Sequence, residues 1–202
     1  MRLRKLITAT VFAIAAAVMP ANAQFGIKTN LLYDATTTPN LGIEIGLKGK
    51  STVNLVYGIN PWTFHSDTKG ERKAKHWVLM PEYRWYTCQK FSGHFIGVHA
   101  MGGEFNAGNV NLPIPGAFIH GENLQKGVRD HRYEGRFLGA GFTYGYQWIL
   151  SKHINFEAEV GVGYNHIWFD KYACGDCGAK LYKGHSNYLG VTKLGLSIMY
   201  LF

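Results

Sequence analysis

The sequence predicts an all-β protein, a transmembrane antiparallel up-and-down β-barrel of about eight strands. Three observations lead to this fold class: eight segments in which apolar and polar residues alternate, a composition rich in glycine and aromatic residues, and an alternation of short and long connections. The chain contains 25 Gly, 12 Tyr, 12 Phe and 5 Trp in 202 residues. Aromatic residues form the girdles at both membrane interfaces of such a barrel, so this composition favours it.

Alternation is clearest in three segments, residues 41–48, 137–148 and 154–165. In the third, Ile154 and Phe156 begin an apolar face, whereas Asn155 alternates with them on a polar face. A period of two is the pattern of a strand with two different faces. Five further strands are expected at residues 25–33, 51–60, 77–87, 94–103 and 188–202. Pro81 cannot donate a ladder hydrogen bond, so it predicts a bulge or a late strand start in its segment.

The connections alternate between short and long, as an up-and-down barrel requires. Short turns are expected near residues 48–51, 89–93 and 151–153. Longer polar loops are expected near residues 34–40, 65–76, 104–134 and 169–187. The chain after residue 23 contains no apolar run of about 18 residues, so no membrane-spanning helix is predicted, and a chain that enters a membrane must do so as a barrel.

Residues 1–23 are predicted to be a cleaved signal peptide, and residues 24–202 a single outer-membrane barrel domain. Three basic residues in the first five precede an apolar run to about Met19, and the small-residue sequence Ala21-Asn22-Ala23 follows. This arrangement is typical of an export signal. Its removal takes three of 21 basic residues and none of 13 acidic ones, so the formal net charge falls from +8 to +5. An exported, mildly basic chain without Lys/Arg runs is not expected to bind nucleic acid.

Alternation assigns eight charged residues to the inner face of the barrel, four of each sign. These residues are Lys28, Glu44, Lys48, Glu82, Arg84, Glu157, Glu159 and Lys193. An eight-stranded barrel leaves an interior about wide enough for side chains, so we expect a paired charge network that fills the lumen and disfavours a pore. A soluble periplasmic barrel or sandwich is the alternative, but its outward polar face would carry more charges than the Gly, Thr and Asn found here.

The last predicted strand ends with alternating apolar residues that include Tyr200 and Phe202. A terminal aromatic residue on such a strand resembles the C-terminal signal by which the outer-membrane barrel-assembly machinery recognises its substrates. We therefore expect that machinery to be a partner during biogenesis, and outer-membrane lipid to be a partner afterwards.

Two segments carry a resemblance to a known family: Lys28-Thr-Asn-Leu-Leu-Tyr-Asp34 and Pro81-Glu-Tyr-Arg-Trp-Tyr86. Together with the overall pattern they resemble a family of small Bacteroidota outer-membrane proteins, catalogued as a domain of unknown function, over essentially the whole chain after residue 23. The resemblance implies an outer-membrane location, a barrel fold and an association with surface or fimbrial systems. It implies no catalytic residues.

The sequence Cys174-Gly-Asp-Cys177 lies in the last long loop. In an exported chain it predicts a local disulfide. A metal site is the alternative, and it would recruit ligands from Asp170, His166 and His185. Cys88 is expected near a short turn on the other side of the membrane, as an unpaired or intermolecular thiol. Neither a cofactor nor a bound metal is predicted.

Two short sequences supply the residue types of a lipid-modifying hydrolase or acyltransferase, namely His185-Ser186 and His65-Ser66-Asp67. They are not a motif, because sequence adjacency does not establish hydrogen-bond reach, and solvated loop histidines are the simpler interpretation.

Apolar residues in the loop at 104–134 are expected to fold over the barrel mouth or to contact a partner at the cell surface. These residues are Leu112, Ile114, Phe118 and Ile119. The sequence thus favours a non-enzymatic outer-membrane barrel that serves as a structural or interaction component of the cell surface. An outer-leaflet lipid-modifying hydrolase or acyltransferase is the alternative.

Overall fold

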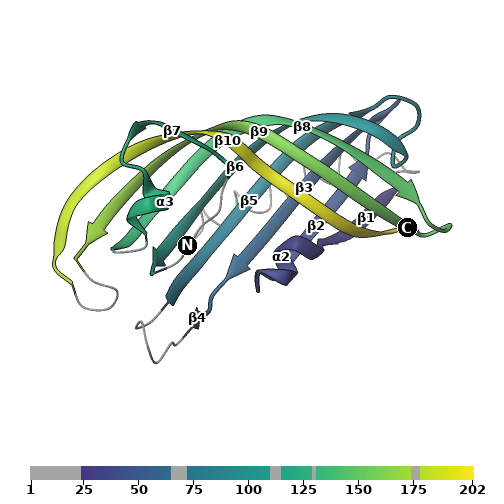
Figure 1. Cartoon of the computed structure of the whole chain (residues 1–202). Helices are drawn as coiled ribbons and strands as arrows, with labels where there is room; N and C mark the ends of the chain where they lie inside the picture. Colours follow the sequence, from purple (N-terminus) through teal and green to yellow (C-terminus); the bar gives the residue numbers. More distant parts are fainter. Residues whose placement is uncertain (1–23, 65–71, 110–114, 129–130, 174–177) are drawn as a thin grey trace, which may run out of the picture.

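The computed structural model describes residues 24–64, 72–109, 115–128, 131–173 and 178–202. Eight antiparallel strands follow one another around a ring, and the last pairs with the first, so the sheet closes into a barrel (Figure 1). The strands are β1 (Phe25–Asn30), β2 (Asn40–Gly46), β3 (Ser51–Asn60), β5 (Arg72–Tyr86), β6 (Gly93–Gly108), β8 (Arg132–Ile149), β9 (Ile154–Tyr172) and β10 (Lys180–Leu201). The predicted all-β, antiparallel up-and-down fold of eight strands is confirmed.

Four short elements lie outside this ring. They are α2 (Leu31–Ala35), β4 (Thr63–Phe64), β7 (Gly116–Gly121) and α3 (Leu124–Gly127). Strand β4 pairs with β5, and β7 pairs with β10. In the part of the chain that the structure describes, no helix is long and apolar enough to cross a membrane.

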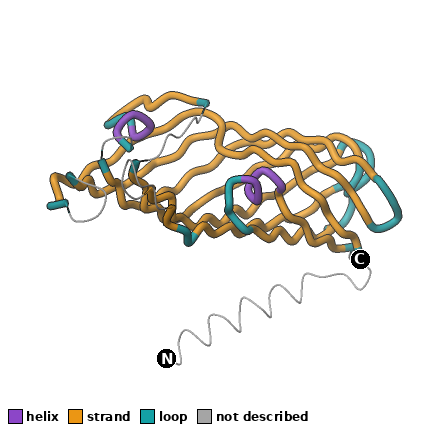
Figure 2. Tube along the Cα trace, turned by 60° about the horizontal axis from the view of Figure 1, so that its bottom comes forward, coloured by secondary structure: helices purple, strands orange, loops and turns teal. Residues whose placement is uncertain are grey.

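The two ends of the barrel differ. The short turns after β2, β5 and β8 lie at the end that carries the C-terminus, which we call the turn end (Figures 1 and 2). Strand β7 and helix α3 lie at the opposite end, which we call the loop end. Gly49 takes a φ of 72° in the turn after β2, a left-handed conformation that glycine adopts without steric cost.

Each strand points alternate side chains outward and inward. On β8, Leu138, Phe142 and Tyr144 are 60%, 70% and 53% exposed on the outside, whereas Thr143 and Gln147 are buried inside. The same alternation holds around the ring, so large apolar side chains cover the exterior and polar ones occupy the lumen. This is the reverse of a soluble barrel, which buries its apolar face.

Pro81 neither bulges nor delays its strand, contrary to the expectation. Strand β5 begins at Arg72, and Pro81 pairs in register with Leu55 of β3. On the side of β6, the paired positions skip Met80 and Pro81, and the same register resumes at Glu82. The missing proline N–H therefore costs a local ladder contact without shifting the strands.

Several strands extend further toward the loop end than the alternation predicted. Strands β6, β8 and β9 end or begin well inside the expected loops, at Gly108, Arg132 and Tyr172. Beyond the expected boundaries, charged and other polar residues occupy outward positions of the wall. The sequence there therefore no longer alternates between apolar and polar residues. The hairpins nevertheless continue in register, since backbone pairing does not require an apolar outer face.

Candidate functional site

Seven charged side chains meet in the lumen, and Arg84 of β5 lies at their centre. Its guanidinium donates to all four carboxylates of the cluster: Nε to Glu82 at 2.7 Å, Nη1 to Glu44 at 2.8 Å and to Glu157 at 2.6 Å, and Nη2 to Glu159 at 2.7 Å. The arginine side chain is fully buried. A planar guanidinium with five N–H donors is suited to several carboxylates at once.

Two lysines complete this cluster, which we call the ion network. Lys28 of β1 donates to Glu44 at 3.2 Å and to Glu157 at 2.8 Å. Lys193 of β10 contacts the two other carboxylates at 2.7 Å and 2.9 Å. The network thus joins strands β1, β2, β5, β9 and β10, with three cations against four carboxylates.

Neutral donors offset the excess carboxylate. Glu44 accepts hydrogen bonds at Oε1 from the hydroxyls of Thr52, at 2.7 Å, and Tyr86, at 2.8 Å. Glu82 accepts one from the Asn54 amide at 3.0 Å. These neutral donors add hydrogen bonds that the three cations do not supply. Sequence reasoning missed these three donors, although all of them occupy inward positions of the same alternation.

Lys48 is the charged residue of the expected set that lies elsewhere. It is exposed in the turn after β2, because that strand ends at Gly46 and the alternation of residues 41–48 runs past its end. The expected balance of four against four is therefore wrong, and the buried cluster carries a formal charge of −1.

Packed side chains fill the lumen on both sides of the ion network. Toward the turn end, Phe95 lies 4.4 Å from the guanidinium of Arg84 and packs against Tyr86. Toward the loop end, His99 bridges the hydroxyls of Thr143 and Thr192 at 2.8 and 2.9 Å. Because charged, aromatic and hydroxyl groups interlock across the barrel, the lumen is filled at this level.

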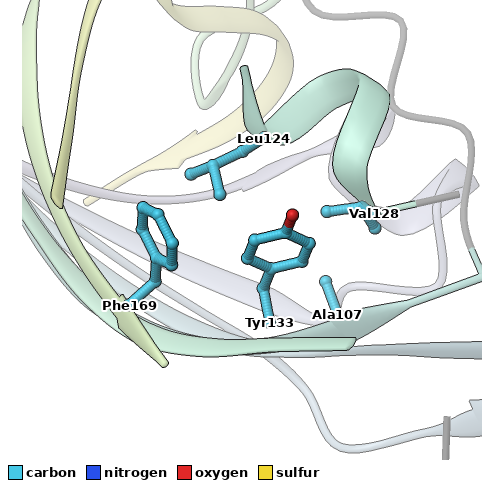
Figure 3. Close-up of a cluster of buried hydrophobic side chains, with 5 residues drawn as sticks. All are labelled: Ala107, Leu124, Val128, Tyr133 and Phe169. Atoms are coloured by element: carbon cyan, nitrogen blue, oxygen red, sulfur yellow. The ribbon is translucent and has the colours of Figure 1, made fainter. Parts of the chain in front are cut away.

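An apolar cluster closes part of the loop end. Helix α3 places Leu124 and Val128 against Ala107, Tyr133 and Phe169 from three strands, and all five are buried (Figure 3). Asn123 caps the helix by accepting from the N–H of Lys126. The segment therefore folds inward as a cap held by burial of apolar side chains.

Glu122 fastens this cap to the wall. Its carboxylate accepts hydrogen bonds from Tyr133 at 2.6 Å, from Lys171 at 2.7 Å and from Tyr182. Burial raises the pKa of Glu122, but these three hydrogen bonds and the Lys171 charge outweigh it, so the pKa lies below its ordinary value. Burial, together with the hydrogen bond to Glu122 and its negative charge, raises the pKa of Tyr182 to about 12.

The apolar loop residues separate in the structure. Phe118 of β7 points inward and packs on Tyr188, with ring centroids 5.4 Å apart. Ile119 is 56% exposed. Leu112 and Ile114 lie outside the described residues, as do Cys174 and Cys177. Cys88 is an exposed free thiol in the turn after β5.

His185 and Ser186 do not form a catalytic pair, because neighbouring residues of β10 point to opposite faces. The Ser186 hydroxyl is buried and donates to the backbone oxygen of Glu122 at 2.8 Å. His185 lies on the outer face, where its ring is 5.6 Å from that of His166 and 5.9 Å from that of His120.

The described ranges contain no group of three or more His, Cys, Asp and Glu side chains placed to hold a metal ion. The sequence His65-Ser66-Asp67, which also supplies the residue types of a lipid-modifying hydrolase or acyltransferase, lies outside them. Tyr200 and Phe202 lie at the turn end, where the two rings pack edge to face and Phe202 stacks on Phe25 at 4.6 Å.

A closed ring of eight antiparallel strands, apolar outside and charged inside, defines a small up-and-down β-barrel whose interior is filled by side chains at the level of the ion network. The chain belongs to the family described as Protein of unknown function (DUF3575), whose model matches residues 6–202. No curated protein matches the chain.

Proposed function

We propose that this protein is an integral barrel of the outer membrane of a Gram-negative-type cell. In this proposal residues 1–23 are the export signal, and the barrel is a non-enzymatic structural or interaction component of the cell surface. The observation that carries the proposal is the inverted distribution of side chains: large apolar residues cover the exterior, and seven paired charges lie in the lumen. Hydrocarbon requires such an exterior, and the pairing of β10 with β1 closes the ring of strands.

Aromatic residues near the two ends of the strands support a membrane orientation. Phe25, Trp148 and Tyr200 lie near the turn end, and Trp77 and Trp168 lie toward the loop end. Such residues prefer the level of the headgroups. In this orientation the turn end faces the periplasm, and the cap faces the exterior.

The loop end supports a role in protein contacts. Ile119 and Leu181 are 56% and 52% exposed there, beyond the part of the wall that lipid would cover. The filled lumen argues against transport of solutes through the barrel, since the ion network and the aromatic layer next to it occupy the interior. Docking of a surface or fimbrial component at the cap is therefore the interaction that we propose.

Membrane fractionation with heat-modifiable migration tests the proposal. The protein should fractionate with outer membranes, and it should migrate faster in detergent gels before boiling than after, because a hydrogen-bonded closed barrel resists detergent until it is heated. Recovery as a soluble species, with one migration before and after boiling, would contradict the membrane location.

A further inference from the structure

Strand β10 changes its neighbour halfway along the barrel. Its C-terminal part pairs with β1 from Leu201 to Ser197, and its N-terminal part pairs with β7 from Gly190 to Ser186. Among the described strands, none pairs with this edge of β10 over residues 192–196, where α2 lies alongside instead. We call this stretch of the wall the seam.

Side chains and a loop carbonyl satisfy the backbone groups at the seam. The Asn30 amide donates to Leu194 O at 3.0 Å, and its oxygen accepts from Leu196 N at 3.2 Å. Val191 N donates to Pro115 O at 3.0 Å. Because these groups are paired without a neighbouring strand, the wall can be interrupted here without leaving bare N–H and C=O groups in an apolar surrounding.

A cavity of about 500 Å³ lies inside the barrel at the seam. Its lining is mostly apolar, with Met101, Phe137 and Ile167 from three strands and Tyr33 from α2. Lys193 is the one lysine, arginine or carboxylate among the described residues that line it, and the ammonium of Lys193 is already bound by two carboxylates of the ion network. The cavity therefore suits an uncharged apolar group rather than a polar solute.

A second hollow lies on the outer face of the same wall. Leu32, Tyr144 and Leu196 line it, and its volume is about 560 Å³. Leu194 lines both the outer hollow and the inner cavity, although its side chain is 53% exposed on the outside. Helix α2 likewise contributes Leu32 to the outer hollow and Tyr33 to the inner one. The two apolar spaces thus lie on either side of Leu194 at the seam.

The seam extends from the middle of the membrane that we propose into its outer half. A strand rises about 3.3 Å per residue and tilts by about 45° in a small barrel, so the six residues from Tyr200 to Leu194 advance about 14 Å along the barrel axis. The apolar band of such a barrel is about 25 Å tall. Acyl chains of the outer leaflet are therefore the molecules that face the seam.

We propose that the inner cavity binds an acyl chain of an outer-leaflet lipid, which enters sideways at the seam while its headgroup stays outside. This inference rests on the proposed membrane location. The cavity volume falls within the range of about 300–1,000 Å³ that is usual for ligand pockets. An apolar lining, an absence of free charge among the described lining residues and the lining residue Leu194 shared with the lipid-facing hollow fit a hydrocarbon chain.

Photochemical labelling tests this proposal. The chain after residue 23 is reconstituted in phospholipid vesicles that contain a phosphatidylethanolamine with a diazirine in the middle of one acyl chain, and labelled residues are located by mass spectrometry. Label is expected at the lumenal positions Met101, Phe137 or Ile167, as well as on outer residues such as Val160.

Two variants should obstruct the path in different places. Thr36→Trp adds bulk at the exposed end of α2, where Thr36 lines the cavity, and Ile167→Trp fills the cavity itself. Each should lower lumenal labelling at least fivefold without changing the labelling of outer residues. Leu189→Trp is the matched control, since Leu189 is exposed on the outside of β10 and does not line the cavity. Heat-modifiable migration verifies that each variant is folded.

The outcomes separate this inference from the proposed function. Labelled outer residues with unlabelled lumenal ones would overturn the acyl-chain site and leave the membrane barrel standing. Lumenal labelling that persists in both folded variants would also overturn the site. An exterior that takes up no label at all would contradict the membrane location, and the inference would fall with it.

Discussion

At Arg84, one guanidinium contacts four carboxylates from three strands, and two lysines contact the same carboxylates from β1 and β10. Every member of the ion network therefore depends on partners that are distant in sequence. Removal of one carboxylate would leave buried, charged N–H donors without their hydrogen-bond partner, which is more costly than the loss of an exposed pair.

Glu157→Ala should consequently destabilise the barrel by about 3–5 kcal/mol, since Arg84 and Lys28 both lose a partner. The free energy of unfolding, measured by urea titration of the reconstituted protein, gives the value. Lys48→Ala is the matched control, because Lys48 belongs to the same alternating pattern but is exposed, and its change should stay within about 0.5 kcal/mol. Equal midpoints for the two variants would mean that the network is hydrated.

The stability of the cap should depend on pH through the ionisation of Glu122. Its pKa in the folded protein lies below the ordinary value, so its contribution to stability is complete above that value and is lost as the pH falls through the lowered pKa. Hydrogen-exchange protection of residues 116–128, corrected for intrinsic rates, should decrease below about pH 4. Glu122→Gln should remove most of this pH dependence, and identical pH profiles for the two proteins would contradict the assignment.

At the scale of elements, β10 closes the ring by pairing with β1, and Phe202 follows it at the turn end. Phe202 N donates to Phe25 O at 2.9 Å, and the two rings stack. Deletion of Phe202, or Phe202→Asp, should lower the amount of assembled barrel several-fold while synthesis is unchanged. Heat-modifiable migration relative to total protein gives this ratio. Ile119→Asp is a control that changes an exposed apolar residue at the loop end, far from the C-terminus, and it should assemble normally.

The central strands could be predicted from the sequence because their two faces meet different surroundings. Residues 154–165 alternate without interruption, and β9 begins at Ile154 as expected. The extensions toward the loop end could not be predicted, since neither face there is uniformly apolar. Strand β7 and helix α3 were missed for a related reason: their apolar residues pack onto one another only after the hairpins have placed Tyr133 and Phe169 beneath them.

Much of the ion network was predictable for the same reason, because inward register follows from alternation. The geometry of the ion network could not be predicted, since nothing in the sequence indicates that Arg84 contacts all four carboxylates. Lys48 was misplaced because alternation alone does not mark the residue at which a strand ends. The seam was also invisible in the sequence, because it arises from the early end of β1 at Asn30, whose side chain caps α2 by accepting from Leu32 N at 3.1 Å.

At the scale of the whole molecule, we predict that no disulfide joins Cys88 to Cys174 or Cys177 within one chain. Cys88 lies at the turn end. Ala173 and Gly178, the described residues on either side of residues 174–177, lie toward the loop end. About 25 Å of apolar wall separates the two ends, and a disulfide joins Cα atoms only about 4.4–6.8 Å apart.

Mass spectrometry of unreduced peptides should therefore find Cys174 joined to Cys177, with Cys88 available to a thiol-reactive reagent. The Cys88→Ser variant should retain the loop disulfide unchanged. A crosslink within one chain from Cys88 to either loop cysteine would contradict the observed strand order, and zinc released on chelation would replace the disulfide with a metal site.

The ion network also bears on how the barrel is assembled. Lys28 stands on the first strand of the ring and Lys193 on the last, while the carboxylates that they neutralise stand on β2, β5 and β9. An unfinished sheet, or one that closes with a different number of strands or a shifted stagger, would leave acidic groups facing each other without these lysines. Mutual repulsion would keep such a sheet open. Completion of the ring is thus coupled to neutralisation of its interior, so the charges favour the correctly closed barrel over incomplete or misregistered ones.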